Sequence, residues 1–199
     1  MRNLVLVGGG GHFISCLDII LMTKLYKIVG IIDKKKISFR NIKYLGDDER
    51  LNDIRKKSSN ALITIGQIHS PNIRISLYKK LKDLNFKMPI ITSPNSTISK
   101  FSSINEGTII MNGSILNANS KIGNNCIINT GSIIEHDVLI NDHCHISTGV
   151  ILNGNVTIGK GTFIGSGTVI KEGVSIGSNC VIGSNQNIKK NIKNFEKIK

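Results

Sequence analysis

One aliphatic residue recurs at every sixth position through the second half of the chain. From Ile98 to Ile188, each step of six residues reaches an isoleucine or a leucine, and none of the sixteen positions fails. The fourth position after each aliphatic is small or β-branched, from Ser102 to Cys180. This period matches neither an α-helix nor a strand that alternates every two residues. The segment therefore predicts a repeat architecture.

A six-residue unit with one large and one small inward side chain suits a short strand followed by a tight corner. Three units close a triangular coil, and stacked coils hydrogen-bond at the usual strand spacing of about 4.8 Å. We therefore expect a left-handed parallel β-helix over residues 93–199. Gln186 and Ile192 depart from the small-residue column, which predicts the capped end of the stack. Cys126, Cys144 and Cys180 lie in that column, so we expect them to be buried packing residues.

The first half alternates between predicted strands and helices. Residues 4–12, LVLVGGGGH, indicate a buried strand and a glycine turn, and a helix follows to residue 24. A second strand over residues 26–33 ends at Asp33. This β-α-β order predicts a Rossmann-like domain over residues 1–92. We also expect helices at 47–57 and 70–85, and strands at 61–66 and 87–92.

The glycine turn does not carry the dinucleotide fingerprint. G-x-G-x-x-G requires a third glycine where the chain has Phe13 or Ile14, which makes an NAD-dependent oxidoreductase a weak alternative. Two interpretations of the turn stay open: it admits a ligand to the backbone beside an anion-favouring helix N-terminus, or it only needs a positive φ. Asp33 likewise either contacts a ribose or base, or caps the loop.

The net charge of +13 is concentrated in the first half. Residues 1–96 carry 17 basic and 7 acidic side chains, against 9 and 6 in residues 97–199. Basic runs without interleaved aromatics are typical of a solvated surface, so we expect a phosphorylated small molecule and no nucleic acid as partner. The first apolar run is too short for a signal sequence or a membrane span, and the four cysteines form no CxxC pair. We expect a cytoplasmic protein with no membrane partner.

The N-terminal GGGGH, the hexads and the stretch INTGSIIEHDVLINDHCHISTG together resemble the sugar O-acyltransferase family of the sialic-acid O-acetyltransferase type. Close members are N-acetyltransferases of UDP-4-amino-4,6-dideoxy sugars. The resemblance covers nearly the whole chain. It implies an acetyl-CoA-dependent enzyme of bacterial surface-glycan biosynthesis, a nucleotide-linked sugar as substrate, and a homotrimer with active sites between subunits. Many relatives carry G-x-P-A-K near the coenzyme, whereas the sequence here ends in IKKNIKNFEKIK.

The resemblance also implies roles for individual residues. His136 corresponds to the catalytic base, Asp137 to the carboxylate that orients it, and His145 to a residue at the acetyl-CoA thioester. Asn129 is expected near the acceptor sugar. The nucleotide-sugar elements carry over as a set: Gly9, Gly10, Gly11, His12 and Asp33, with Gly66 as a weaker addition.

The chemistry of the histidine-rich stretch can be argued from its residues alone. A histidine, with its ordinary pKa near 6.5, suits a base that takes a proton from an acceptor amine or hydroxyl. His136 holds the third place of its hexad, which points away from the coil. No exposed serine or cysteine pairs with it in sequence, so we predict direct transfer without an acyl-enzyme. His145 or a backbone N–H would stabilise the oxyanion, and His143 is expected to be solvated.

Other functions are weighed against acetyl transfer. Three histidines in one coil suggest a zinc hydrolase as an alternative function. The spacing of His143 and His145 argues against it, and we expect no metal. A scaffold that only displays a surface is another alternative. Among acetyl acceptors, we favour the 4-amino group of a UDP-linked sugar, with O-acetylation of a sialic-acid-like sugar as the alternative.

Overall fold

The computed structural model describes residues 1–199 and divides them into two compact units. The first contains Met1–Gly66 and Ile73–Pro89, and the second contains Gln67–Asn72 and Ile90–Lys199. The boundary expected between residues 92 and 93 stays a prediction. Each unit has a core of its own.

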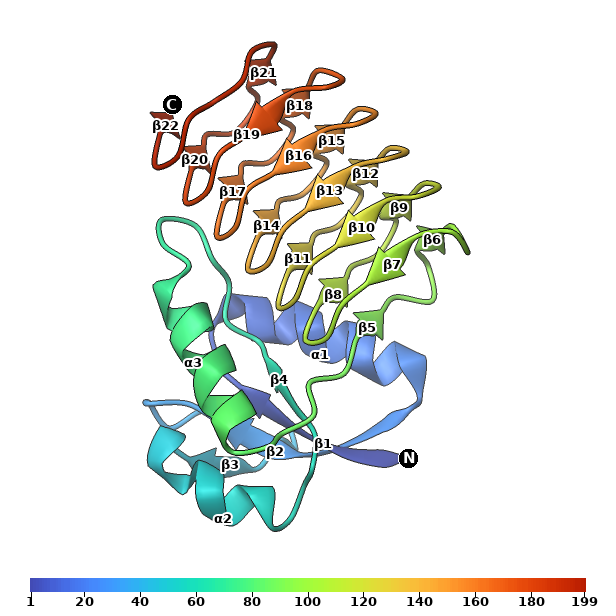
Figure 1. The fold of residues 1–199 in the computed structure, drawn as a ribbon. Helices are drawn as coiled ribbons and strands as arrows, with labels where there is room; N and C mark the ends of the chain where they lie inside the picture. Colours follow the sequence, from blue (N-terminus) through green and yellow to red (C-terminus); the bar gives the residue numbers. More distant parts are fainter. The chain divides into compact units, whose positions relative to one another are not determined.

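The first unit is built on a parallel four-stranded sheet with the order β3-β2-β1-β4 (Figure 1). Its strands are β1 (Arg2–Val7), β2 (Tyr26–Ile32), β3 (Tyr44–Gly46) and β4 (Ala61–Ile63). Its helices are α1 (Gly11–Thr23), α2 (Leu51–Arg55) and α3 (Asn72–Asp83), with a 3-10 turn at Asp48–Arg50 before α2. The β-α-β order and the Rossmann-like class predicted for this half are confirmed.

The central strand of this sheet is buried on both faces. Val5 and Val7 belong to one apolar cluster with Leu51 of α2 and Leu77 of α3. Because side chains alternate along a strand, Leu4 and Leu6 point to the opposite face, and neither is exposed to solvent. Burial on both faces explains the continuous apolar run in the sequence.

The strand expected over residues 87–92 does not form in this sheet. Lys87 makes only an isolated parallel bridge to Asn60. Ile91 and Thr92 form β5 and pair with β8 of the second unit, where the Ile91 N–H donates to the Thr108 carbonyl at 3.0 Å. Ile91 fits there because it stacks in register on Ile109, so the coils begin one strand earlier than the repeat predicted.

The second unit is a left-handed parallel β-helix with three parallel sheets, drawn as stacked coils in Figure 1. The β14 sheet contains β5 (Ile91–Thr92), β8 (Ile109–Ile110), β11 (Ile127–Ile128), β14 (His145–Ile146), β17 (Phe163–Ile164), β20 (Val181–Ile182) and β22 (Lys197–Ile198). The β12 sheet contains β6 (Thr97–Ile98), β9 (Ile115–Leu116), β12 (Ile133–Ile134), β15 (Ile151–Leu152), β18 (Val169–Ile170) and β21 (Asn187–Ile188). The β13 sheet contains β7 (Ser103–Ile104), β10 (Lys121–Ile122), β13 (Leu139–Ile140), β16 (Thr157–Ile158) and β19 (Ser175–Ile176).

The predicted aliphatic column forms the core of the coils. Ile128, Ile134 and Ile140, one from each sheet, are fully buried in a single cluster. Cys126, Cys144 and Cys180 are fully buried as well, which confirms them as packing residues. Burial raises the pKa of the Cys144 and Cys180 thiols, and this keeps them protonated and unreactive.

The stack does not end where the small-residue column breaks. After β21, Ile192 bridges to Ile176 and packs against the buried core, and β22 then pairs with β20. The chain reaches Ile192 only four residues after Ile188, so the six-residue step shortens once and the coil continues. The predicted cap at Gln186 and Ile192 was therefore wrong.

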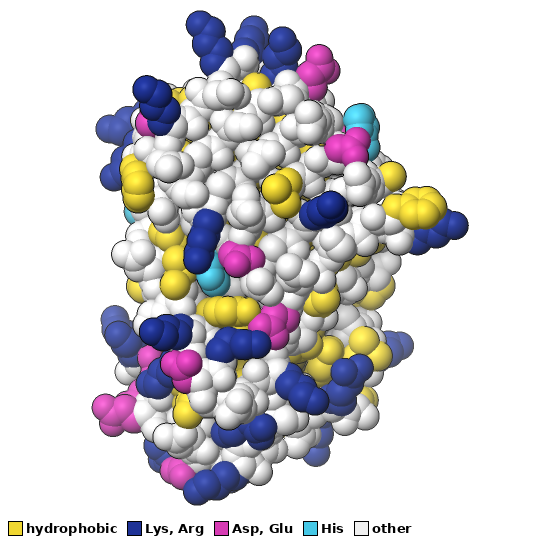
Figure 2. Space-filling view, viewed as in Figure 1, with side chains coloured by type: hydrophobic (Ala, Val, Ile, Leu, Met, Phe, Trp, Pro, Cys, Tyr) yellow, Lys and Arg dark blue, Asp and Glu magenta, His cyan; other side chains and the backbone are white.

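Charged side chains are spread over the surface. In Figure 2 the Lys and Arg side chains on the visible face are separated by polar and acidic groups and do not merge into one stripe. None of the helices combines the length and the apolar character needed to cross a bilayer.

The coil core predicts a sharp contrast between two neighbours in β13. Ile140 is fully buried and Leu139 is 39% exposed. We expect Ile140→Ala to lower the free energy of unfolding by about 2–5 kcal/mol, because it leaves a cavity among packed coils. Leu139→Ala should cost less than about 1 kcal/mol. Chemical unfolding followed by circular dichroism measures both, and equal losses would contradict the inward assignment.

Candidate active site

The glycine turn leaves backbone open at two of its four glycines. Gly8 has a φ of 105°, and a Cβ there would lie 2.1 Å from Cγ1 of Ile65, so this position requires glycine for the fold. A Cβ at Gly9 would meet Ile37 at 2.6 Å. Gly10 and Gly11, in contrast, have no atom within 4 Å of the built Cβ position. A ligand therefore has room to approach the backbone only at Gly10 and Gly11.

Asp33 holds the turn in place. One carboxylate oxygen accepts the Gly9 N–H at 2.7 Å, and the other accepts the Lys35 N–H at 2.9 Å. The Tyr44 hydroxyl donates to the Asp33 backbone carbonyl at 3.0 Å. Loop capping, one of the two roles left open by the sequence, is thus observed, and contact with a ribose or base would use the remaining lone pairs of the same carboxylate.

His12 and Gly66 lie side by side at the carboxyl edge of the sheet. A Cβ built on Gly66 would be 3.5 Å from Cβ of His12. In the strand order β3-β2-β1-β4, the chain winds in one direction from β1 to β2 and in the other from β1 to β4. Ligands of open α/β sheets bind at such a reversal, outside the carboxyl ends of the strands. The predicted residues of the first unit therefore gather at one edge.

His136 lies on the corner that follows β12, and Asp137 is its hydrogen-bond partner. Nδ1 of His136 is 2.8 Å from Oδ2 of Asp137, and Nδ2 of Asn119 donates to the other carboxylate oxygen at 2.5 Å. The side chains of His136 and Asp137 are 64% and 48% exposed. Because a carboxylate only accepts, Nδ1 carries the proton and Nε2 of the neutral ring presents a lone pair to solvent.

The carboxylate changes the acidity of both partners. The hydrogen bond that His136 donates to Asp137 raises the pKa of His136 above its ordinary value, and the charges of Asp137 and Glu135 act in the same direction. The hydrogen bonds from His136 and Asn119 lower the pKa of Asp137. Asp137 therefore stays ionised, and it makes His136 a stronger base than a free histidine.

The ring of His136 lies directly against Gly154 of the next coil. A Cβ at position 154 would be 2.7 Å from Cε1 and 2.8 Å from Nε2. Glu135 and Glu172 lie beside the ring in an open hollow of about 470 Å³. Glycine at position 154 thus allows the imidazole to lie flat on the coil with Nε2 at the edge of this hollow.

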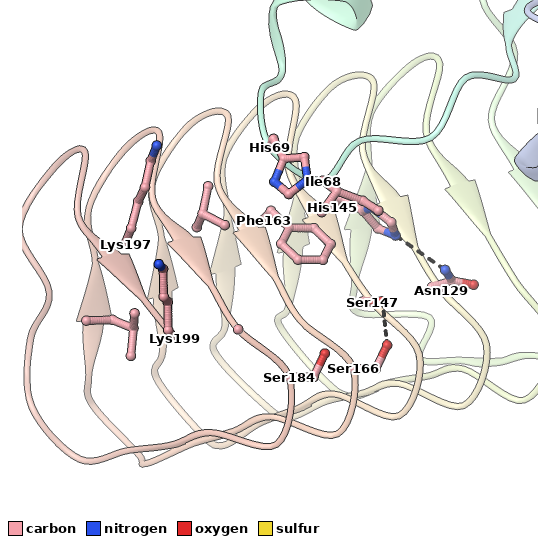
Figure 3. Close-up of a pocket in the computed structure, with 13 residues that line it drawn as sticks. Ile68, His69, Asn129, His145, Ser147, Phe163, Ser166, Ser184, Lys197 and Lys199 are labelled. Atoms are coloured by element: carbon pink, nitrogen blue, oxygen red, sulfur yellow. Dashed lines mark hydrogen bonds between the residues drawn. The ribbon is translucent and has the colours of Figure 1, made fainter.

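A second hollow, of about 690 Å³, runs along the outer face of the β14 sheet (Figure 3). The register pairs His145 with Phe163, Phe163 with Val181, and Val181 with Lys197. We call these four side chains the His145 ladder. The small polar residues Asn129, Ser147, Ser166 and Ser184 line the hollow beside it.

His145 is held in one tautomer. Nδ1 lies 2.5 Å from the backbone carbonyl of Gln67, which only accepts, so Nδ1 carries the proton. The Thr130 N–H donates to Oδ1 of Asn129 at 2.8 Å, and this fixes the amide so that its Nδ2 faces Nε2 of His145 at 3.3 Å. Neutral His145 therefore accepts at Nε2. It is not placed to donate to an oxyanion, which leaves a backbone N–H for that role.

His143 and His145 are not solvated corner residues. They are 5% and 6% exposed, and the segment Gln67–Asn72, which we call the strap, contacts both. Nε2 of Gln67 donates to the His143 carbonyl at 3.0 Å, and Nδ1 of His143 lies 2.9 Å from Nδ2 of Asn125. The expectation of a solvated His143 was wrong because the strap covers it, and His145 is the first residue of β14.

The three histidines of this stretch lie in different surroundings. His136 lines the smaller hollow, His145 lines the larger one, and neither hollow includes the other residue. His143 packs against Asn125. No group of three or more His, Cys, Asp or Glu side chains is arranged to hold a metal ion. The coil thus separates the candidate base from the ladder.

Comparisons with known proteins agree with this arrangement. Residues 3–81 match the PglD N-terminal domain, and residues 155–185 match the bacterial transferase hexapeptide (six repeats). The acetyltransferase domain of PglB from Neisseria gonorrhoeae, solved in complex with acetyl coenzyme A, is 26% identical with a TM-score of 0.93, over 98% of this chain and 95% of that one. Over nearly its whole length the chain is therefore similar to hexapeptide-repeat sugar acetyltransferases.

Two further structures are similar to this acetyltransferase. PerB from Caulobacter crescentus, in complex with CoA and GDP-perosamine, is 27% identical with a TM-score of 0.92, over 98% of this chain and 92% of that one. WeeI from Acinetobacter baumannii is 22% identical with a TM-score of 0.84, over 98% and 94% of the two chains, and shows the shared fold. No curated protein sequence matches significantly.

Several residues that line the acetyltransferase's two hollows or support their side chains escaped the sequence analysis. Asn119 supports Asp137 from one coil away, a relation that the eighteen-residue step predicts once Asp137 is chosen. Phe163 and Lys197 follow from His145 by the observed register. Gln67 gave no signal, because its contact with His143 joins residues 76 positions apart and no motif marks it.

The His136–Asp137 pair predicts a specific pH dependence. The base must be neutral to accept a proton, so kcat/KM should rise with pH through a midpoint above 6.5, because the pKa of His136 is raised. Asp137→Asn removes the main cause of that shift, and the midpoint should move to lower pH while kcat falls. The acceptor amine titrates equally in both assays, so the difference between the profiles reports the histidine. An unchanged midpoint in Asp137→Asn would contradict the pairing.

Proposed function

We propose that this enzyme transfers the acetyl group of acetyl-CoA to the 4-amino group of a UDP-linked 4-amino-4,6-dideoxy sugar, in the cytoplasm, for bacterial surface-glycan biosynthesis. The observation that carries the proposal is His136, an exposed imidazole whose Nδ1 is bound by Asp137 and whose Nε2 faces an open hollow. The similar structures add weight, since PglB was solved with acetyl coenzyme A and PerB with CoA and GDP-perosamine.

In the proposed reaction the sugar amine attacks the thioester carbonyl. The new C–N bond forms as the carbonyl π electrons move to oxygen, and Nε2 of His136 takes the proton that the nitrogen loses. Asp137 stabilises the resulting imidazolium. Collapse of the tetrahedral adduct breaks the C–S bond, and the thiolate of the coenzyme leaves and is protonated. One base is sufficient, so no covalent acyl-enzyme is required.

The hollow on the β14 sheet suits an extended coenzyme arm. Apolar Phe163 and Val181 occupy its middle, and His145 with Asn129 occupies one end. Nε2 of neutral His145 accepts from Nδ2 of Asn129, so these two side chains form a polar but uncharged end of the hollow. Transition-state charge on the thioester oxygen would then be stabilised by a backbone N–H.

The edge of the first unit suits a nucleotide diphosphate. Open backbone at Gly10 and Gly11 forms the N-terminus of α1, whose first turn contains no acidic side chain. The free N–H groups and the dipole of this helix favour an anion. We assign Gly10, Gly11, His12, Asp33 and Gly66 to this part of the substrate site, whereas Gly9, whose N–H is bound by Asp33, holds the turn in place. Asn129 was expected near the acceptor sugar, but its amide is committed to His145 and Thr130, which favours a place beside the coenzyme.

Activity with defined substrates tests the proposal. Wild-type enzyme should acetylate a UDP-4-amino sugar from acetyl-CoA, and His136→Ala should lower kcat about 10²–10⁴-fold with an unchanged melting temperature. Calorimetric titration with UDP, GDP and CMP should show the tightest binding for UDP. Full turnover by His136→Ala would reject the catalytic assignment. Tighter binding of GDP or CMP than of UDP would reject UDP as the nucleotide of the substrate.

O-acetylation of a sialic-acid-like sugar is the alternative on the acceptor side. A histidine base serves a hydroxyl as well as an amine, so the His136–Asp137 geometry supports both. The glycine turn, which suits a diphosphate, and the basic charge of the first unit favour the nucleotide-linked amine.

We also propose that the enzyme is a homotrimer. The four middle strands of the β12 sheet carry the outward side chains Ile115, Ile133, Ile151 and Val169, all partly exposed and stacked in register, between polar Thr97 and Asn187 on the two end strands. On the β13 sheet the equivalent outward positions hold Ser103, Lys121, Leu139, Thr157 and Ser175. All of these except Leu139 are polar. An aliphatic ladder of this kind is stabilised by burial against a second copy.

A charge in the aliphatic ladder should break the trimer. Ile133→Glu places a carboxylate where we expect a desolvated interface, so light scattering after size exclusion should show monomers. Leu139→Glu, on the β13 sheet, should remain trimeric. A wild-type monomer that is fully active would reject the trimer and leave the chemistry of His136 standing.

A further inference from the structure

Five exposed cations lie at the amino ends of the strands in the first unit, at the edge of the sheet opposite the glycine turn. Arg2 begins β1, Lys24 and Lys27 flank the start of β2, and Lys57 and Lys87 belong to the segments that follow α2 and α3. We call these five side chains the amino-edge cations. β1 contains six residues, so about 17 Å separates this edge from the glycine turn. A ligand of the amino edge is therefore distinct from the nucleotide sugar.

Backbone contacts hold the segments that carry these cations together. Nδ2 of Asn3 donates to the Lys57 carbonyl at 3.2 Å, and the Lys87 N–H donates to the Ser59 carbonyl at 2.8 Å. Arg2, Lys57 and Lys87 line one open hollow of about 480 Å³, and no carboxylate lines it. Three like charges thus share one polar hollow, and an anion bound there would relieve their repulsion.

The protein does not neutralise the amino-edge cations itself. None of the five side chains forms an ion pair or a hydrogen bond. The guanidinium of Arg2 lies 5.6 Å from the centre of the Tyr26 ring, a contact that leaves its N–H groups for a ligand. Of the acidic side chains at the ends of α2 and α3, Asp53 pairs with Lys56 at 3.5 Å, and neither Asp53 nor Asp83 lines the hollow. The edge therefore presents a positive surface.

Helix dipoles explain only part of this charge. A cation just after the end of a helix is stabilised by the dipole, which accounts for Lys24 after α1 and Lys57 after α2. Arg2 and Lys27 belong to strands, and Lys87 forms a parallel bridge to β4's neighbour Asn60. The fold of the unit does not require a charge at these three positions.

An apolar side chain lies among the cations. Leu25 is 53% exposed beside Lys24, and its carbonyl accepts the Arg2 N–H at 3.0 Å. Cations around an exposed aliphatic group suit an anionic bilayer, because the charges meet lipid phosphates while the apolar group enters the interface. An open polar hollow offers little apolar wall to a small organic molecule. An extended anionic surface, in contrast, contacts all five cations at once.

We propose that the amino edge of the first unit docks on an anionic lipid membrane through the amino-edge cations and Leu25. The contact is peripheral and needs no helix that spans the bilayer. It would replace the expectation of no membrane partner, which rested on the length of the first apolar run. The glycine turn lies at the other edge of the same sheet, so that edge would face away from the lipid and stay open to substrate.

Vesicle sedimentation tests the docking surface. The wild type should sediment with phosphatidylcholine vesicles containing about one third phosphatidylglycerol but not with phosphatidylcholine alone, and about 1 M salt should release it. Lys57→Glu/Lys87→Glu should lower the partition coefficient at least about 100-fold, since each unit of charge contributes about fivefold. Lys189→Glu/Lys190→Glu is the matched control, because it changes the net charge equally at exposed lysines of the second unit and should bind like the wild type. Both variants should keep the wild-type melting temperature.

A dye at position 25 reports which surface meets the lipid. The four native cysteines are buried, so Leu25→Cys provides one accessible thiol. An environment-sensitive dye on that thiol should shift its emission to shorter wavelength when anionic vesicles are added. The same dye on Leu139→Cys, at an exposed leucine of β13, should not respond.

Three results would overturn the proposal: no binding of anionic vesicles, equal loss of binding in both charge-reversed variants, or a dye response at position 139 and none at position 25. Binding of polyglutamate without binding of vesicles would assign the edge to an acidic polypeptide and reject the membrane. Acetyl transfer is measured separately without vesicles, so failure of the docking surface leaves the proposed function standing, and the reverse holds as well.

Discussion

Backbone hydrogen bonds between successive coils fix the position of every functional side chain on the β-helix. Strand residues pair with the residue eighteen positions on, as Ile127 does with His145 and His145 with Phe163, except at the last step, where Val181 pairs with Lys197. The inward isoleucines hold this register, because a slip by one residue would expose the whole aliphatic column. The outward side chains therefore form a rigid grid with fixed positions on successive coils. Residues far apart in the sequence contact one another on this grid with little conformational freedom.

The grid explains how the candidate base is tuned. Asn119, Asp137 and Asn155 occupy equivalent places on three successive coils, and Asn119 and Asp137 are joined by a hydrogen bond. His136 is aligned in the same way with Gly154, whose missing side chain makes room for the ring. On a flexible loop, an exposed histidine–carboxylate pair would be weakened by side-chain entropy and solvent. Here the αL turn at Asp137, with a φ of 60°, keeps the carboxylate beside the imidazole.

What the sequence could predict depends on whether periodicity encodes it. The six-residue repeat placed the inward isoleucines, the buried cysteines and the outward direction of His136, because each follows from a position in the hexad. Periodicity could not predict the burial of His143 and His145, since the covering strap is separated from them by more than 70 residues and carries no repeat. It also misassigned Ile91, because an apolar residue beside Pro89 fits a Rossmann strand and a first coil equally well. The six-residue step failed only after Ile188, where a shortened corner still delivers Ile192 to the core.

The triangular cross-section has a consequence for the proposed chemistry. His136 follows the β12 sheet, whereas the His145 ladder lies on the β14 sheet, so one chain presents the base and the donor hollow at separate places. Direct transfer needs the base, the amine and the thioester within hydrogen-bond reach of one another. The aliphatic ladder of the β12 sheet lies next to the His136 corner, and a neighbouring copy packed there would bring its own surface to the base. In the proposed trimer the same ladder would therefore also supply the geometry that a single chain lacks, and the stability of the assembly would be linked to its catalysis.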